Sequence, residues 1–171
     1  PGVVLQQGSS AIVEMGCLEK AQEKILQDLK NKFDSEFLSF KISDDIFYTL
    51  WKKMIIVGAF GTIMTSFRMS FRELIDSKYG EKILSETMKE IKKVGIAEKI
   101  KLGTVNISEI IEELRAEADE MTSSMFNDLK NRKPLEIDSI LGYVVNLAKL
   151  KNIDLPYSQT LVSSLENFKE G

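Results

Sequence analysis

The chain has 171 residues, of which 43% are hydrophobic and 29% charged, and its formal net charge is −3. This balance is typical of a folded globular domain and excludes a disordered chain. Basic residues are dispersed among acidic ones, so nucleic acid is not an expected partner. Cys17 is the only cysteine and histidine is absent. An intrachain disulfide, a cysteine or histidine metal site and histidine-based catalysis are therefore excluded.

The sequence shows no targeting or membrane-spanning segment. The longest apolar stretch, Met54 to Phe67, is shorter than the roughly 18 residues that a span needs, and it predicts a buried helix. The chain begins Pro1-Gly2 without a signal peptide, and a start other than methionine is typical of a processed or truncated chain. We expect a cytoplasmic protein without a membrane partner, because a reducing compartment suits the single cysteine.

Residues 1–45 are predicted to form a small β-β-α-β segment. Residues 3–7 and 11–15 have the pattern of short strands around a glycine–serine turn, and residues 37–42 alternate like a half-buried strand. Between them, apolar residues at helical spacing predict an amphipathic helix over residues 17–34. Four elements cannot bury both faces of a sheet, so we interpret this segment as the end of a larger α/β domain.

From residue 46 onward the patterns predict helices and no strand. A helix over residues 46–66, which starts at acceptors around Asp45, is apolar on nearly every side and is typical of a central buried helix. Ser70 is expected to cap the next helix. A third helix is expected to stop at Gly95, because glycine commonly ends helices.

The remaining helices are predicted from residues that typically begin or end a helix. Asn106 or Ser108 is expected to cap a long helical stretch that reaches Lys130, either continuous or interrupted near Asp119. The short basic run of residues 130–133 complements the helix dipole at its end. Pro134 is expected in the first turn of the following helix. The fold class is therefore mainly α, with six or seven helices over residues 46–171 after a small α/β segment over residues 1–45.

Lys53 is the first candidate for chemistry. It falls on the arc of the central helix that contains Leu50, Val57 and Gly61. A lysine on an apolar arc either extends to solvent or is held in a pocket. An apolar surrounding disfavours the charged form of a lysine and makes it a better proton donor near neutral pH. Structural ion pairs give the same pattern, so both interpretations stay open.

Two further positions are weaker candidates. Ser124 and Asp128 share a helix face, where the hydroxyl either holds a carboxylate or bonds back into its own helix. Glu136 stands in a predicted first turn, where the helix dipole stabilises an acid, and this interpretation is favoured on spacing alone. The alternative is an inward-facing acid, because Glu136 shares a helix side with Ile140, Tyr143 and Leu147. Gly58 and Gly61 lie inside the central helix, where each costs about 1 kcal/mol relative to alanine, and helix–helix contact is the favoured reason.

Taken together, these segments resemble the ketopantoate reductase family. Residues 45–53 are similar to its "DI…LWxK" motif, and residues 123–138 to its "SSMxxD…EID" signature. Gly142 and residues 152–156 match the closing pattern of the family. Residues 8–16 resemble the last hairpin of its nucleotide-binding domain. The resemblance covers essentially the whole chain.

The resemblance implies a two-domain, NADPH-dependent reductase that converts ketopantoate to pantoate. Residues 1–45 would be the end of its Rossmann domain. Residues 46–171 would be a substrate domain like that of 6-phosphogluconate dehydrogenase. Lys53 would be the general acid that protonates the carbonyl oxygen. Glu136 would bind the substrate hydroxyl and orient the lysine, and Ser124 would bond the substrate carboxylate. Because the helical domain forms dimer contacts in some members, a homodimer is expected.

Some positions depart from the family pattern. Val57, Gly61 and Met121 stand where the family usually has asparagine, which favours a different or bulkier 2-oxo acid. No G-x-G-x-x-G motif follows a strand, so NADP(H) is expected to bind only the full-length protein and this chain alone is predicted to be inactive. No metal is expected. The alternative function is a non-catalytic helical module for dimerisation or partner binding.

Overall fold

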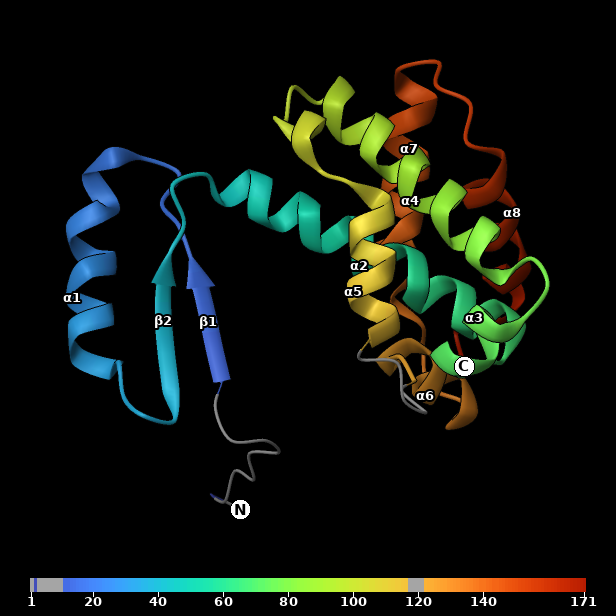
Figure 1. Ribbon diagram of the computed structural model, residues 1–171, viewed down its shortest axis with the longest axis horizontal. Coiled ribbons are helices and arrows are strands. Elements are labelled where there is room, and N and C mark those ends of the chain that lie inside the picture. Colours follow the sequence, from blue (N-terminus) through green and yellow to red (C-terminus); the bar gives the residue numbers. More distant parts are fainter. Residues whose placement is uncertain (1, 3–10, 117–121) are drawn as a thin grey trace. The chain divides into compact units, whose positions relative to one another are not determined.

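The computed structural model describes residues 2, 11–116 and 122–171 and divides into two compact units, residues 1–49 and 50–171. Figure 1 shows the elements in chain order. The first unit contains β1 (Ala11–Met15), α1 (Glu23–Phe33) and β2 (Leu38–Ile42). Helix α2 (Ile46–Phe67) begins in the first unit and ends in the second. The predicted mainly α fold is confirmed.

The first unit is a β-α-β arrangement with a parallel sheet. β1 pairs with β2 in the register that runs from Ala11 opposite Leu38 to Met15 opposite Ile42. Parallel strands need a crossover connection, which α1 and a preceding 3₁₀ turn provide. The strands predicted over 11–15 and 37–42 are confirmed, and the predicted helix starts later than expected. The strand predicted over residues 3–7 lies outside the described residues.

Most apolar side chains of the first unit are exposed. None of the described residues between 11 and 49 is buried, and Ile12, Leu18, Ile25 and Phe37 are each about 60–70% exposed. A parallel sheet is normally covered on both faces, and two strands with one helix cannot supply that cover. This exposure supports the interpretation of the unit as part of a larger α/β domain.

Seven α-helices occur in the described part of residues 46–171, in agreement with the predicted six or seven. After α2 they are α3 (Phe71–Asp76), α4 (Gly80–Ala97), α5 (Ile107–Ala116), α6 (Ser124–Lys130), α7 (Leu141–Leu150) and α8 (Pro156–Leu165). Short 3₁₀ turns are η2 (Leu102–Thr104), η3 (Glu136–Asp138) and η4 (Glu166–Phe168). The core of the second unit is formed by apolar side chains of these helices, among them Ile63, Leu84, Ile91, Val144 and Leu161.

Helix α2 is buried only along its second half. Burial begins at Ile55 and includes every residue from Gly61 to Thr65, whereas Leu50 is 53% exposed. The prediction of a central buried helix is therefore correct for its second half alone. The apolar stretch is also longer than predicted: by length and composition α2 could cross a membrane, a test that core helices of globular proteins also pass.

Side-chain caps explain where several of the helices begin. Asp45 Oδ1 accepts the Tyr48 N–H (3.0 Å) at the start of α2, and Ser70 forms a capping box with Glu73 at α3. The Ser70 N–H and hydroxyl donate to the Glu73 carboxylate and hold its pKa below the usual value. Asn106 Oδ1 accepts the Ser108 N–H (3.0 Å) at α5, so Asn106 is the cap of the two predicted candidates.

Gly95 does not end its helix, contrary to the prediction. Helix α4 continues to Ala97. A Cβ at Gly95 would lie 2.4 Å from Leu102 Cδ1 and 2.8 Å from Trp51 Cε3. The glycine is there because Leu102 and Trp51 pack directly against the helix backbone.

The stretch expected to reach Lys130 contains two helices, α5 and α6, with Ser123 capping the second. This agrees with the alternative of an interrupted stretch, although Asp119 itself lies outside the described residues. The next predicted helix differs. Pro134 precedes a 3₁₀ turn rather than an α-helix, and α7 begins only at Leu141. The first-turn position predicted for proline is instead occupied by Pro156 of α8.

Four helices of the second unit end with a non-glycine residue in the left-handed region. Arg68, Lys99, Arg132 and Asn152 have φ values of 54–66°. At the end of α4, the Ile100 N–H bonds Gly95 O and the Lys99 N–H bonds Ile96 O. This is the Schellman pattern, in which the left-handed residue is usually glycine. A side chain with a Cβ is strained in that conformation.

Replacement of Lys99 by glycine is therefore expected to stabilise the protein. Relief of the left-handed strain should raise the free energy of unfolding by about 0.5–1 kcal/mol, net of the freedom that glycine gains in the unfolded chain. Thermal and urea unfolding would measure the change. Lys101 has a φ of −76°, so Lys101→Gly should instead destabilise. Equal destabilisation by both variants would contradict the argument.

Candidate functional site

Helix α2 carries the first candidate residue, Lys53. Its side chain is exposed in the second unit, so the described residues do not enclose it in a pocket. Leu50 and Val57, which flank it on the same arc, are 53% and 36% exposed. Lys53 is therefore flanked on its arc by two accessible apolar side chains and is itself open to solvent.

The segment before Ser124 is fixed to α2 by Ser123. The Ser123 hydroxyl donates to Gly61 O (3.3 Å) and accepts the Phe126 N–H (3.0 Å), which makes it the N-cap of α6. The Thr65 hydroxyl donates to the same Gly61 carbonyl (2.7 Å). Ser123 is buried, whereas Ser124 is exposed. Ser123 therefore anchors α6, and the neighbouring Ser124 presents its hydroxyl to solvent.

The segment of Glu136 reaches α2 through its apolar neighbours. Ile137 of η3 is fully buried, and a Cβ at Gly58 would lie 3.6 Å from Ile140 and 3.5 Å from Ile91 of α4. These are ordinary van der Waals distances, and the nearest neighbour of such a Cβ is Met54 Sδ of the same helix at 3.1 Å, so helix contact as the reason for Gly58 stays a prediction. Glu136 itself is exposed.

Lys53, Ser124 and Glu136 therefore lie on or beside segments that share α2 as a support. Within the described part of the chain, no hydrogen bond or ion pair joins any two of them. Gly142, the other motif residue, packs on η3, because a Cβ there would lie 2.8 Å from Ile137 O. The described residues contain no group of three or more acids or cysteines placed to hold a metal ion.

One half-buried cluster of polar groups was not predicted. Glu90 of α4 accepts the N–H groups of Tyr157 (3.0 Å) and Ser158 (2.7 Å) and the Ser158 hydroxyl (2.6 Å). The acid thus caps α8 from a different helix. Glu90 and Ser158 are far apart in sequence, so local spacing gives no signal for this cap.

The second unit is thus a mainly helical domain. Its apolar helix α2 carries one of the candidate residues, the accessible Lys53. The model of the family described as ketopantoate reductase PanE/ApbA C terminal matches residues 45–169. The chain belongs to this family.

Curated relatives agree with this assignment. The 2-dehydropantoate 2-reductase of Pyrococcus horikoshii is 28% identical over 156 residues, which are 91% of this chain and 51% of that protein. The enzyme of the same name from Streptococcus pyogenes serotype M3 is 23% identical over 99% of this chain and 55% of its own length. The chain thus spans about half the length of these relatives.

Solved structures share the fold. A complex of D-mandelate dehydrogenase with NADH and anilino(oxo)acetate has a TM-score of 0.84 and 24% identity, over 96% of this chain and 68% of that one. A dimeric ketopantoate reductase from Staphylococcus aureus has a TM-score of 0.79 and 20% identity, over 91% of this chain and 54% of that one.

Proposed function

We propose that this chain is the substrate domain of an NADPH-dependent 2-oxo acid reductase in which Lys53 is the general acid. The observation that supports this proposal most is that the segments of Lys53, Ser124 and Glu136 all lie on helix α2 or beside it. Gly61 O accepts the Ser123 hydroxyl, and Gly58 lies beside Ile140, which follows the turn that contains Glu136. Both glycines follow Lys53 within three turns of α2.

Each residue has a chemical role in this proposal. Reduction of a 2-oxo acid to a hydroxy acid requires a proton on the former carbonyl oxygen, and the Lys53 ammonium supplies it. Without histidine in the chain, a lysine beside apolar side chains is a suitable donor. Glu136 accepts a hydrogen bond from the substrate hydroxyl and orients the ammonium. The Ser124 hydroxyl donates to the substrate carboxylate.

The described residues do not fit a dinucleotide. The turn after β1 contains one glycine, Gly16, whose close neighbour is Ile46: a Cβ at Gly16 would lie 2.5 Å from Ile46 Cβ. This glycine therefore serves packing, and a glycine-rich phosphate cradle at a helix start is absent from residues 11–116 and 122–171. NADP(H) is proposed for the full-length protein, with residues 1–45 as the end of its nucleotide-binding domain, and this chain alone is expected to be inactive.

The substrate is ketopantoate or a related 2-oxo acid. Leu50 and Val57 present carbon to any molecule that reaches Lys53, which suits a branched or aromatic substituent at least as well as a hydroxylated one. The D-mandelate dehydrogenase structure, solved with anilino(oxo)acetate, is consistent with this preference. We place the enzyme in the cytoplasm as a homodimer.

The alternative is a non-catalytic helical module that serves dimerisation or partner binding. The feature that favours it is the absence of amide side chains at Val57 and Gly61, which leaves fewer polar groups to hold a substrate. Oxidation of NADPH and NADH by the full-length protein separates the two functions. With ketopantoate and a panel of branched and aromatic 2-oxo acids, we expect turnover. No turnover with any of these acids would exclude the enzyme.

A further inference from the structure

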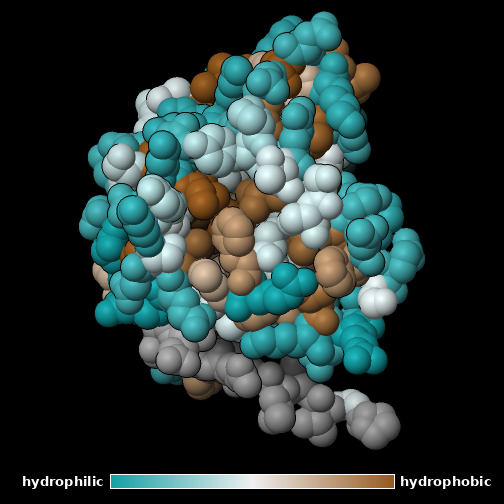
Figure 2. Space-filling model, turned by 90° about the vertical axis from the view of Figure 1, so that its right-hand side faces the viewer, coloured by the Kyte–Doolittle hydropathy of each residue, from teal (hydrophilic) through white to brown (hydrophobic). Residues whose placement is uncertain are grey.

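A basic pocket lies where α2, α6 and η4 end. Its volume is about 640 Å³, and its lining includes Arg68, Lys130 and Arg132 beside the rings of Phe126 and Phe168. No aspartate or glutamate lines it, and its remaining lining residues are Leu129 and Gly171, the last residue of the sequence. The second unit has other hollows, including an apolar groove between α4 and α8, and Figure 2 shows apolar residues gathered in a recess ringed by polar ones. A second pocket of the same volume is also basic and is lined by Lys89, Lys92 and Lys93. There, however, Lys89 pairs with Glu86 and Lys92 donates to the Gly103 and Val105 carbonyls. The basic pocket of Arg68 differs from it by its two guanidinium groups.

Two of the three cations of this pocket lie over aromatic rings, and the Arg68 guanidinium also donates to Ser66 O (3.3 Å). The Arg68 guanidinium lies 5.2 Å from the centre of the Phe168 ring, and the Lys130 ammonium lies 4.1 Å from the centre of the Phe126 ring. Such cation–π contacts position a charge without neutralising it. Among the ion pairs of the described residues, none includes Arg68, Lys130 or Arg132.

Both arginines occupy strained backbone positions. Arg68 follows α2 and Arg132 follows α6, with φ values of 56° and 54°. The bonds Met69 N–H to Met64 O (3.2 Å) and Lys133 N–H to Asp128 O (2.9 Å) identify these turns as Schellman ends, where glycine is preferred. A favourable interaction with the helix dipole would need only a cation in the last turn. It does not explain two arginines at left-handed positions beside one cavity.

We propose that the basic pocket binds a small ligand through a phosphate group that carries two negative charges. Guanidinium groups pair with phosphate oxygens through two parallel hydrogen bonds. Three cations line the same pocket, and like charges repel, so a phosphate dianion bound between them would lower that repulsion. The volume is sufficient for the rest of a metabolite-sized ligand. None of Lys53, Ser124 and Glu136 lines this pocket, so the proposal does not depend on the proposed reductase activity.

Calorimetric titration of the full-length protein with inorganic pyrophosphate at constant ionic strength tests the proposal. We expect saturable binding with a dissociation constant below about 1 mM. Arg68→Gly and Arg132→Gly should each weaken binding at least about tenfold, because each removes one guanidinium. Since glycine suits both backbone positions, the melting temperatures should stay equal or rise. Weaker binding therefore cannot be attributed to unfolding.

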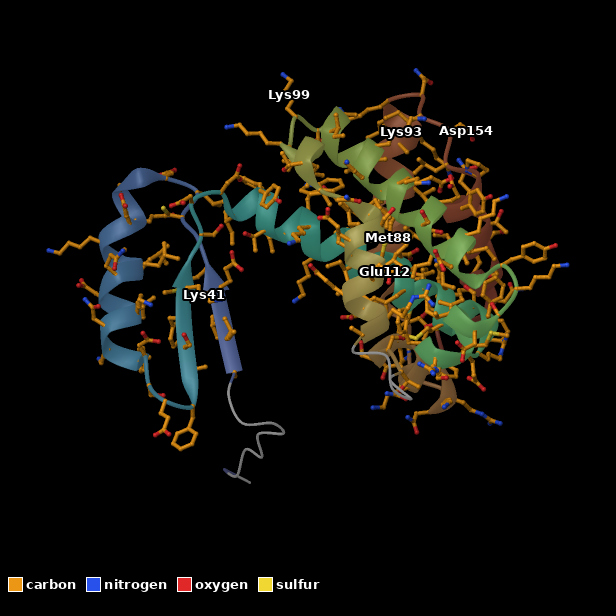
Figure 3. The ribbon with its side chains drawn as sticks, in the orientation of Figure 1. Lys41, Met88, Lys93, Lys99, Glu112 and Asp154 are labelled. Carbon is orange, nitrogen blue, oxygen red and sulfur yellow. The ribbon has the colours of Figure 1, made fainter. Side chains whose placement is uncertain are left out.

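Lys99→Gly is the matched control. Lys99 occupies the same left-handed position at the end of α4, and Figure 3 shows its side chain pointing away from the helices. It does not line the pocket, so its replacement should leave pyrophosphate binding unchanged. Two results would overturn the proposal: the absence of saturable binding, or an equal loss of affinity in Lys99→Gly and the two arginine variants. Arg68→Gln and Arg132→Gln would repeat the test without glycine.

Discussion

Replacement of Lys53 by alanine in the full-length protein is expected to lower kcat for 2-oxo acid reduction at least about 100-fold. General acid catalysis by a positioned side chain contributes roughly 10²–10⁴-fold to a rate, and the chain has no histidine to take over the proton transfer. The fold should survive, because the Lys53 side chain is exposed. Steady-state kinetics with the best 2-oxo acid, together with the melting temperature, would measure both effects.

Lys52→Ala is the control for this prediction. Lys52 is also exposed, precedes Lys53 by one position, and lies about 100° away around the helix. Its loss should change kcat less than about twofold. Lys53→Arg keeps the positive charge but removes a group that gives up its proton readily, so it should be nearly as slow as Lys53→Ala. A normal kcat in Lys53→Ala would remove the lysine from the mechanism.

Much of the fold could be predicted because its determinants are local. The caps at Asp45 and Ser70 each join two residues that are three positions apart in the sequence. Both caps form as the spacing predicts. The apolar character of residues 46–66 predicts α2 for the same reason. The prediction that Gly95 ends its helix is wrong. A glycine that ends a helix and a glycine that lets a side chain such as Leu102 pack against the helix have the same sequence pattern. Only the tertiary contact distinguishes them.

The candidate site was less predictable because its residues come from separate segments. Motif spacing identified Ser124, but the neighbouring serine, Ser123, makes the buried bonds to Gly61 and Phe126. A pair of serines before an apolar run predicts a cap without showing which serine provides it. The basic pocket was missed for a related reason. Residues 130–133 were interpreted as a helix end, and nothing local indicates that Arg68 lies beside them.

Replacement of Glu90 by alanine is expected to destabilise the second unit by about 2–4 kcal/mol. The variant would lose three hydrogen bonds of 2.6–3.0 Å, from two N–H groups at the start of α8 and from the fully buried Ser158 hydroxyl. Buried donors without acceptors cost about 1–3 kcal/mol each, and water can reach some of them. The melting temperature should fall by roughly 5–15 °C. Glu86, one turn earlier, pairs with exposed Lys89 and with no other cation of the described residues, so Glu86→Ala should cost less than about 1 kcal/mol. Similar losses in both variants would mean that the cap contributes nothing beyond a surface charge.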